Sequence, residues 1–283
     1  LNSEVFFMLT EAMIRKQVAN AAEKARQTTP LAGSITNFVT VDFVANAQLA
    51  VGGSAAMVYL PDEARSLVRL GSSFYINVGT LLPVYAESVP VAMDEAAATD
   101  KPWVLDPVAL GIGTLRTELL QHARSCHPAV IRGNASEIIA LADLWNLSHG
   151  GGAGVRGVDT TDTVEAAETA AIALARHTGG AVAVSGKRDL ITDGTHVLTA
   201  EGGSPLMEKV TGCGCSLGGV IAVYAAVTDP FTAACCGTFA YNLAGESASS
   251  VAVGPASFKS AFIDNLYILA DKLDTAKFSL TEV

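Results

Sequence analysis

Two spacings of apolar residues alternate along the chain, one near the period of a helix and one in short β-prone runs. Helical spacing predicts helices over Ser3–Gln27, Pro83–Ala98, Leu115–Arg124, Ala135–Trp145 and Thr161–Thr178. The short runs predict strands over Ser73–Val78, Trp103–Leu105, Ala129–Ile131 and Ala181–Val184. This alternation indicates an α/β fold with a mostly parallel central sheet and helices on both faces.

The last third of the chain follows a different pattern. Within Asp189–Thr199, Asp193-Gly194 separates two β-prone runs and therefore predicts a hairpin. Three helices are then expected, over Cys215–Val227, Phe231–Ala248 and Pro255–Leu273. A length of 283 residues without an internal repeat fits one α/β domain over residues 1–283.

The charge and composition of the chain argue against nucleic acid and membranes as binding partners. The net charge of −10, with only 18 Lys and Arg, leaves no basic surface for nucleic acid. The apolar runs are far shorter than the roughly 20 residues that cross a membrane, and the first residues lack the basic region of a secretion signal. Five cysteines, an odd number, suit a reducing compartment. We therefore expect a cytoplasmic protein that binds neither nucleic acid nor membrane.

Two glycine-rich stretches are candidates for binding phosphate. His149–Gly157, HGGGAGVRG, contains the spacing Gly-x-Gly-x-x-Gly of a dinucleotide fingerprint, but it follows a helical stretch rather than a strand, so we interpret it as a surface loop. Lys209–Val220, KVTGCGCSLGGV, runs directly into a predicted helix. Backbone N–H groups can converge at its glycines, and the helix dipole adds positive potential. We expect an anion hole formed by Gly212, Cys213, Gly214 and Cys215, whereas tight helix–sheet packing is the alternative explanation of the glycines.

Two acidic residues follow neighbouring predicted strands. Asp106 comes directly after one strand, and Glu137 lies at the start of the helix after the next. Ligands of parallel α/β sheets bind outside the carboxyl ends of strands, so both carboxylates are candidates to hold Mg²⁺ beside the phosphates. Arg132 is a candidate clamp for the phosphate chain. Alternatively, Asp106 caps a turn before Pro107 and Asn134 caps the next helix.

Taken together, these motifs resemble those of the hydroxyethylthiazole kinases, the thiamine-salvage branch of the ribokinase-like superfamily. Eight segments in the order of that family carry the resemblance: Ser34–Met57, INVGTL (Ile76–Leu81), LDPVALG (Leu105–Gly111), IRGNASEI (Ile131–Ile138), GVDTTD (Gly157–Asp162), SGKRDLITDG (Ser185–Gly194), VTGCGC (Val210–Cys215) and GPASFKSAFIDNL (Gly254–Leu266). The resemblance implies a ribokinase-like fold over the whole chain.

The implied reaction transfers the γ-phosphoryl group of ATP to the hydroxyl of 5-(2-hydroxyethyl)-4-methylthiazole. By the same resemblance, Arg132 and Ser185 contact ATP, Met57 and the backbone of Gly212 line the thiazole site, and Asp106 and Glu137 serve Mg²⁺. Cys215 stands where sugar kinases of the superfamily have an aspartate base. The family also implies a homotrimer with active sites between subunits.

The chemistry of Cys215 leaves a mechanistic hypothesis and two alternatives. A thiol is mostly protonated at neutral pH, so Cys215 would be a weak base, and positioning and electrostatics would carry most of the catalysis. Phosphorylation of another small alcohol, or dehydration of a hydrated nicotinamide, remains an alternative within the superfamily. A sensor that uses Cys213 and Cys215 as a redox pair is the alternative from another class. Asn37 and Asn46 are interpreted as turn and cap residues.

Overall fold

Nine strands form one continuous sheet in the computed structural model, which describes residues 9–147 and 164–283. The strands lie in the order β2-β1-β3-β4-β5-β6-β7-β8-β9. The strands β1 to β6 run parallel to one another, whereas β7, β8 and β9 are added by antiparallel pairing, starting with β7 against β6. Their bounds are β1 Leu31–Ile35, β2 Ser54–Met57, β3 Ser73–Asn77, β4 Trp103–Asp106, β5 Val130–Asn134, β6 Ala181–Ser185, β7 Asp189–Thr192, β8 His196–Glu201 and β9 Lys277–Glu282.

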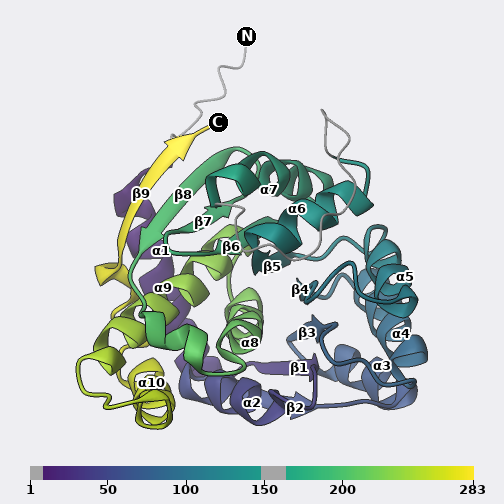
Figure 1. Cartoon of the computed structure of the whole chain (residues 1–283), viewed down its shortest axis with the longest axis horizontal. Coiled ribbons are helices and arrows are strands. Elements are labelled where there is room, and N and C mark those ends of the chain that lie inside the picture. Colours follow the sequence, from purple (N-terminus) through teal and green to yellow (C-terminus); the bar gives the residue numbers. More distant parts are fainter. Residues whose placement is uncertain (1–8, 148–163) are drawn as a thin grey trace.

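Helices cover both faces of the sheet (Figure 1). Their bounds are α1 Glu11–Thr28, α2 Val41–Ala50, α3 Pro61–Leu70, α4 Tyr85–Ala98, α5 Thr114–Ala123, α6 Ala135–Leu144, α7 Val164–Thr178, α8 Cys213–Ala225, α9 Pro230–Ser249 and α10 Pro255–Ile268. Two apolar cores result: α1, α2, α8, α9 and α10 pack on one face of the sheet, and α3 to α7 pack on the other. The expected fold class is confirmed.

Three helix boundaries differ from the prediction by a few residues. The helix α1 begins at Glu11, because Thr10 is extended and its hydroxyl accepts a hydrogen bond from Met13 N–H; residues 3–8 of the predicted helix lie outside the described residues. The helix predicted from Cys215 begins two residues earlier, at Cys213, directly after Gly212 in the left-handed conformation. The last helix ends at Ile268, and a separate 3₁₀ turn, Leu273–Thr275, follows it. The hairpin around Asp193-Gly194 is confirmed as β7–β8.

The sequence patterns missed four elements between residues 31 and 70, namely β1, α2, β2 and α3, as well as the edge strand β9. The strands β1 and β2, LAGSI and SAAM, consist mainly of small residues, and β1 is stabilised between two neighbouring strands rather than by β-propensity. The loop interpretation of His149–Gly157 and the segment Gly157–Asp162 lie outside the described residues. Among residues 9–147 and 164–283, no helix is long and apolar enough to cross a membrane.

Candidate active site

The start of α8 presents unpaired backbone N–H groups at the centre of the sheet's carboxyl edge. Gly212, with φ +91°, is the N-cap residue, and a side chain there would press on Thr40. Cys213 N–H already bonds to Val210 C=O at 3.4 Å, and Ser216 N–H makes the first bond back to Gly212 C=O at 2.8 Å. The first turn of a helix has no further internal partners, so the N–H groups of Gly214 and Cys215 remain for an anion.

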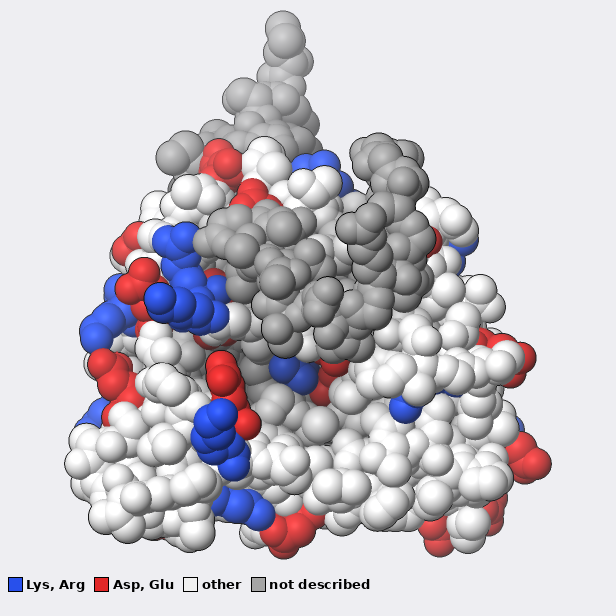
Figure 2. Space-filling view, viewed as in Figure 1, with Lys and Arg blue, Asp and Glu red and all other residues white. Residues whose placement is uncertain are grey.

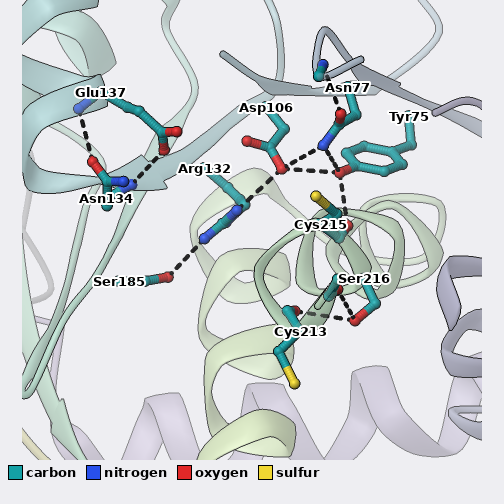
Figure 3. Close-up of polar contacts among 12 residues, drawn as sticks. Tyr75, Asn77, Asp106, Arg132, Asn134, Glu137, Ser185, Cys213, Cys215 and Ser216 are labelled. Atoms are coloured by element: carbon teal, nitrogen blue, oxygen red, sulfur yellow. Dashed lines mark hydrogen bonds and ion pairs between the residues drawn. The ribbon is translucent and has the colours of Figure 1, made fainter. Parts of the chain in front are cut away.

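Beneath this helix start, Asp106 is fully buried at the end of β4 and faces α8. Its Oδ2 atom accepts three hydrogen bonds, from Arg132 Nη1 at 3.0 Å, Asn77 Nδ2 at 2.9 Å and Tyr75 OH at 3.0 Å. Its Oδ1 atom is buried without a hydrogen-bond partner (Figure 3). Asp106 does not cap the turn before Pro107, which was the alternative role. Its Oδ2 atom accepts hydrogen bonds from side chains of β3 and β5 instead.

Arg132 connects this buried carboxylate to a deep pocket. Its Nη2 atom donates to Ser185 Oγ at the end of β6, 3.2 Å away, and its guanidinium lies against Gly214. An added Cβ at Gly214 would come 3.1 Å from Arg132 Nη1, so only glycine gives the guanidinium ordinary clearance there. The pocket, about 730 Å³ in volume, is lined by Arg132, Ser185 and Gly214 together with Asp189, Tyr241 and Asn242.

The pocket wall is ordered by its own hydrogen bonds. Asp189 accepts from Gly186 N–H at 3.0 Å and from Asn242 Nδ2 at 2.9 Å, which ties the loop after β6 to α9. The molecular face drawn in Figure 2 is mostly uncharged, with basic and acidic atoms together on the floor of a central hollow. A charged floor in a largely uncharged face suits a ligand with a charged end.

Glu137 serves a different purpose from Asp106 in this structure. Its Oε2 atom accepts the N–H of Asn134 at 2.9 Å while Asn134 Oδ1 accepts the N–H of Glu137 at 2.9 Å, a reciprocal capping box at the start of α6. Its Oε1 atom accepts Ala109 N–H at 3.2 Å. The alternative interpretation of Asn134 as a helix cap is therefore confirmed, and Glu137 remains near enough for its charge to act on Asp106.

The two cysteines of the glycine turn lie on opposite sides of the first turn of α8 (Figure 3). Cys215 Sγ lies 3.5 Å from Asn37 Nδ2 and faces the Asp106 cluster, whereas Cys213 is buried and lines the pocket. All five cysteines are free thiols. This separation disfavours a disulfide between Cys213 and Cys215, and with it the redox-sensor alternative.

Burial dominates the protonation of this cluster. It raises the pKa of Asp106 to about 6, against the lowering effect of Arg132, so the carboxylate is still mainly ionised at neutral pH. Burial, followed by the charge of Asp106, raises the pKa of the Cys215 thiol. For Arg132, burial works to lower the pKa, but Asp106 and Glu137 outweigh it and raise the pKa above its usual value. The cluster thus holds one anion, one cation and a neutral thiol.

The residues present fit a magnesium ion. Asp106 Oδ1 is a buried oxygen without a partner, and Figure 3 shows it directed toward the side of Glu137. Oxygen ligands of this kind, with water completing the shell, are those that Mg²⁺ prefers. Glu137 already accepts a backbone N–H at each oxygen, which suits contact through water better than direct coordination.

Three polar residues of the cluster escaped the sequence interpretation. Tyr75 OH lies 2.7 Å from the carbonyl of Cys215, so it links β3 to α8, and a side chain at Gly218 would collide with its ring. Asn77 bridges Asp106 and Asn37, and Asn37 belongs to the site rather than only to a turn. The two-residue period in β3 was the available signal, since Ser73, Tyr75 and Asn77 share the face toward α8.

Two further residues named in the sequence analysis, Met57 and Asn46, lie outside the Asp106 cluster. Met57 ends β2, the edge strand next to β1, and is partly buried against the core that contains α8. Asn46 does not cap a helix. Its side-chain amide donates to the carbonyl and the carboxylate of Asp42, one turn earlier in the same helix. The structure thus gathers Asp106, Arg132 and Ser185 with the glycine turn.

Comparison with known proteins gives the family. The profile of the Hydroxyethylthiazole kinase family matches residues 22–272. The hydroxyethylthiazole kinase of Bifidobacterium longum (strain DJO10A) is 49% identical over 276 residues, covering 91% of this chain and 88% of that protein.

Solved structures agree with this result. The hydroxyethylthiazole kinase protein from Pyrococcus horikoshii OT3 superposes with a TM-score of 0.83 at 30% identity, covering 95% of this chain and 99% of that one. A ribokinase-like superfamily protein from Enterococcus faecalis V583, only 12% identical, shares the fold with a TM-score of 0.63, covering 96% of this chain and 99% of that one. The chain belongs to the hydroxyethylthiazole kinase family.

Proposed function

We propose that this protein is an ATP-dependent kinase that transfers the γ-phosphoryl group of ATP to the hydroxyl of 5-(2-hydroxyethyl)-4-methylthiazole, giving the phosphate ester used in thiamine salvage. The observation that carries this proposal is the 49% identity to a hydroxyethylthiazole kinase over 91% of the chain. The site supports it, because an anion-binding helix start, an arginine and a buried carboxylate meet at one edge of the sheet.

The nucleotide would occupy the pocket beside Arg132, with its phosphates pointing to the start of α8. Arg132 and Ser185 bind the phosphate chain, and the N–H groups of Gly214 and Cys215 bind the transferring group. Phosphoryl transfer depends mainly on positioning and on stabilising charge, which these donors supply without reorganising. Gly212, held in the left-handed conformation, aims the helix start, and Cys213 acts as a small buried spacer beside it.

The acceptor alcohol would approach from the side of Met57, Asn37 and Cys215. The Cys215 thiol is a weak base because burial raises its pKa, so it positions the alcohol more than it deprotonates it. We infer that Asp106 and Glu137 hold Mg²⁺ through Asp106 Oδ1 and water. When bound, the ion would neutralise phosphate charge. Charge at Asp106 and Arg132, rather than a thiolate, thus governs turnover.

We further propose one domain over residues 1–283, a homotrimer with active sites between subunits, and a cytoplasmic location. One sheet running from residue 31 to residue 282 supports the single domain. Exposed apolar side chains near the carboxyl edge, Phe38, Val39 and Leu60, at 51%, 55% and 51% exposure, support a subunit contact there. Five free thiols support a reducing compartment.

The direct test is a coupled assay with ATP, Mg²⁺ and hydroxyethyl-methylthiazole, followed by mass spectrometry of the product. We expect the thiazole phosphate only when all three are present. Folded, ATP-binding protein that yields no thiazole phosphate would refute the substrate. Hydroxymethylpyrimidine, tested in parallel, is the matched control alcohol, and its preferential phosphorylation would favour the alternative reaction.

A further inference from the structure

A second group of chemically reactive side chains lies between α4 and the end of α5. Asp94 comes from α4, His122 from the last turn of α5, and Cys126 from the segment between α5 and β5. Their ligating atoms all lie within 4.8 Å of one another. We propose that Asp94, His122 and Cys126 form a binding site for a zinc-class transition-metal ion, separate from the active site.

The donor set selects the class of metal. A thiolate, an imidazole and a carboxylate are the three ligand types that zinc uses in proteins, and three of them leave a fourth position for water. Mg²⁺ and Ca²⁺ require six or more oxygen ligands, whereas this group offers one carboxylate. The soft sulfur of Cys126 therefore makes zinc or a similar ion the matching ligand.

The distances leave room for such an ion. Cys126 Sγ lies 3.7 Å from Asp94 Oδ1. Tetrahedral coordination with metal–ligand bonds of about 2.0–2.3 Å separates sulfur and oxygen ligands by about 3.5 Å. His122 Nε2 lies 2.6 Å from the same oxygen in a hydrogen bond, and this pair would open to about 3.3 Å when the ion replaces the shared proton.

The backbone of Cys126 is held in place, whereas the side chains of His122 and Asp94 can move. The backbone of Cys126 is held because Trp103 Nε1 donates to its carbonyl at 3.1 Å and its own N–H bonds to Ala123 C=O at 3.1 Å. The side chains of His122 and Asp94 are 36% and 62% exposed. They can therefore move by the required fraction of an ångström, and solvent can deliver the ion.

The Cys126 thiol is directed at the other ligands. Its Sγ atom donates to Asp94 Oδ1 at 3.7 Å and lies 3.6 Å from the carbonyl of His122. A metal ligand must be a thiolate, so a bound ion would take the place of this proton. The same carboxylate that accepts the proton in the free protein would then become a ligand.

The site lies far from the proposed chemistry. Both helices belong to the layer on the opposite face of the sheet from α8, and they pack against each other (Figure 1). Helices that connect parallel strands run back along the sheet, so the end of α5 lies near the amino end of β5, whereas Asp106 lies at a carboxyl end. A bound ion would cross-link α4 to the segment before β5 without touching substrate.

The test uses chelator-treated full-length protein titrated with Zn²⁺ by calorimetry and with Co²⁺ by absorption spectroscopy. We expect a sulfur-to-cobalt charge-transfer band and a rise in melting temperature with zinc. His122→Gln and Cys126→Ser should each lower affinity at least about tenfold, since even outer partners of metal ligands cost 10–100-fold. His122 is partly exposed, so we expect His122→Gln to fold, and its loss of affinity can be measured even if Cys126→Ser does not fold.

Two control variants keep the test specific. Cys213→Ser removes a thiol of the active site, and His127→Asn removes a neighbouring imidazole while asparagine tolerates the φ of 45° found there. Both should retain the cobalt band. The proposal is overturned if wild-type protein gives no band, if the band survives in Cys126→Ser, if His122→Gln binds Co²⁺ as tightly as wild type, or if Cys213→Ser abolishes the band.

Discussion

Asp106 and Glu137 follow neighbouring strands at the same edge of the sheet, yet the two regions around them are organised differently. Asp106 is fully buried, and its Oδ2 atom is surrounded by three side-chain donors while Oδ1 has none. Glu137 accepts a backbone N–H at each carboxylate oxygen. Position at a strand end thus locates a carboxylate near the site, whereas its partners determine what it is free to bind.

This contrast assigns different work to the two residues. Asp106 balances the buried charge of Arg132 and keeps one oxygen for a ligand, so its loss affects both the charge of the site and the fold. Glu137 organises the start of α6 and adds negative charge at a distance. Variants of each should therefore separate catalysis from local structure.

The largest effect is expected for Asp106→Asn. The amide keeps the shape but cannot balance Arg132 or present an anionic oxygen, so kcat should fall roughly 10³-fold, the upper range for loss of one electrostatic group. Leaving Arg132 without its partner should also cost about 3–5 kcal/mol of unfolding free energy. Steady-state kinetics at 25 °C and urea unfolding measure the two effects. Activity within tenfold of wild type would remove Asp106 from the site.

A smaller effect is expected for Glu137→Gln, which matches Asp106→Asn in chemistry. Glutamine can preserve the capping box with its one acceptor oxygen but loses the bond from Ala109 N–H, so unfolding free energy should fall by only about 0.5–1.5 kcal/mol. Loss of the charge should raise the Mg²⁺ concentration for half-maximal rate about 10–100-fold, as for outer partners of metal ligands. If Glu137→Gln lowered kcat as much as Asp106→Asn, the contrast between the two regions would fail.

Substitution of Cys215 tests whether the thiol is a base. A positioned general base contributes roughly 10²–10⁴-fold. Because the pKa of Cys215 is raised, we expect Cys215→Ala to lose at most about tenfold in kcat, with the KM for ATP unchanged. Cys215→Asp should keep or raise turnover. Abolished turnover in Cys215→Ala, with both substrates still bound, would make the thiol essential.

The smallest effect is expected for Tyr75→Phe. The hydroxyl has one proton for two nearby oxygens, Cys215 O and Asp106 Oδ2, and its removal leaves the buried carboxylate with two donors. A hydrogen bond contributes about 0.5–1.5 kcal/mol, so kcat should fall about fivefold. Phenylalanine preserves the packing against Gly218. An unchanged Mg²⁺ dependence together with unchanged kcat would mean that Tyr75 only fills space.

The sequence alone was sufficient for the charged part of this site. Asp106 follows from the end of a predicted strand and Arg132 from the next strand, and parallel strands bring these ends together, whereas Ser185 came from the family resemblance. The hydrogen-bonding side chains were harder to find. Tyr75 and Asn77 lie in a strand that is buried throughout, where a tyrosine looks like a core residue until the helix above it is known.

Local patterns failed where tertiary contacts determine the structure. The strand β1 is built from small residues that fit beneath close neighbours, and Gly33 would collide with Leu67 and Phe74 if it carried a side chain. The sequence could not separate a capping role of Glu137 from a metal-binding role, because the capping box explains the same residue pattern as a metal site does. The hydrogen bonds in the structure distinguish the two carboxylates. Both oxygens of Glu137 accept a backbone N–H, whereas Asp106 Oδ1 has no partner.

The pH dependence of kcat/KM for ATP distinguishes control by Asp106 from control by the Cys215 thiolate, because Asp106 titrates below neutral pH and Cys215 above it. We predict a kcat/KM that is flat from about pH 7 to 9 and falls about tenfold per unit below about pH 6, where buried Asp106 becomes protonated. Asp189 also has a pKa raised to about 6 by burial, so Asp189→Asn, which should retain the acid limb, is the control. A kcat/KM that keeps rising tenfold per unit toward pH 9 would instead mean that the Cys215 thiolate, and not charge at Asp106 and Arg132, drives the reaction.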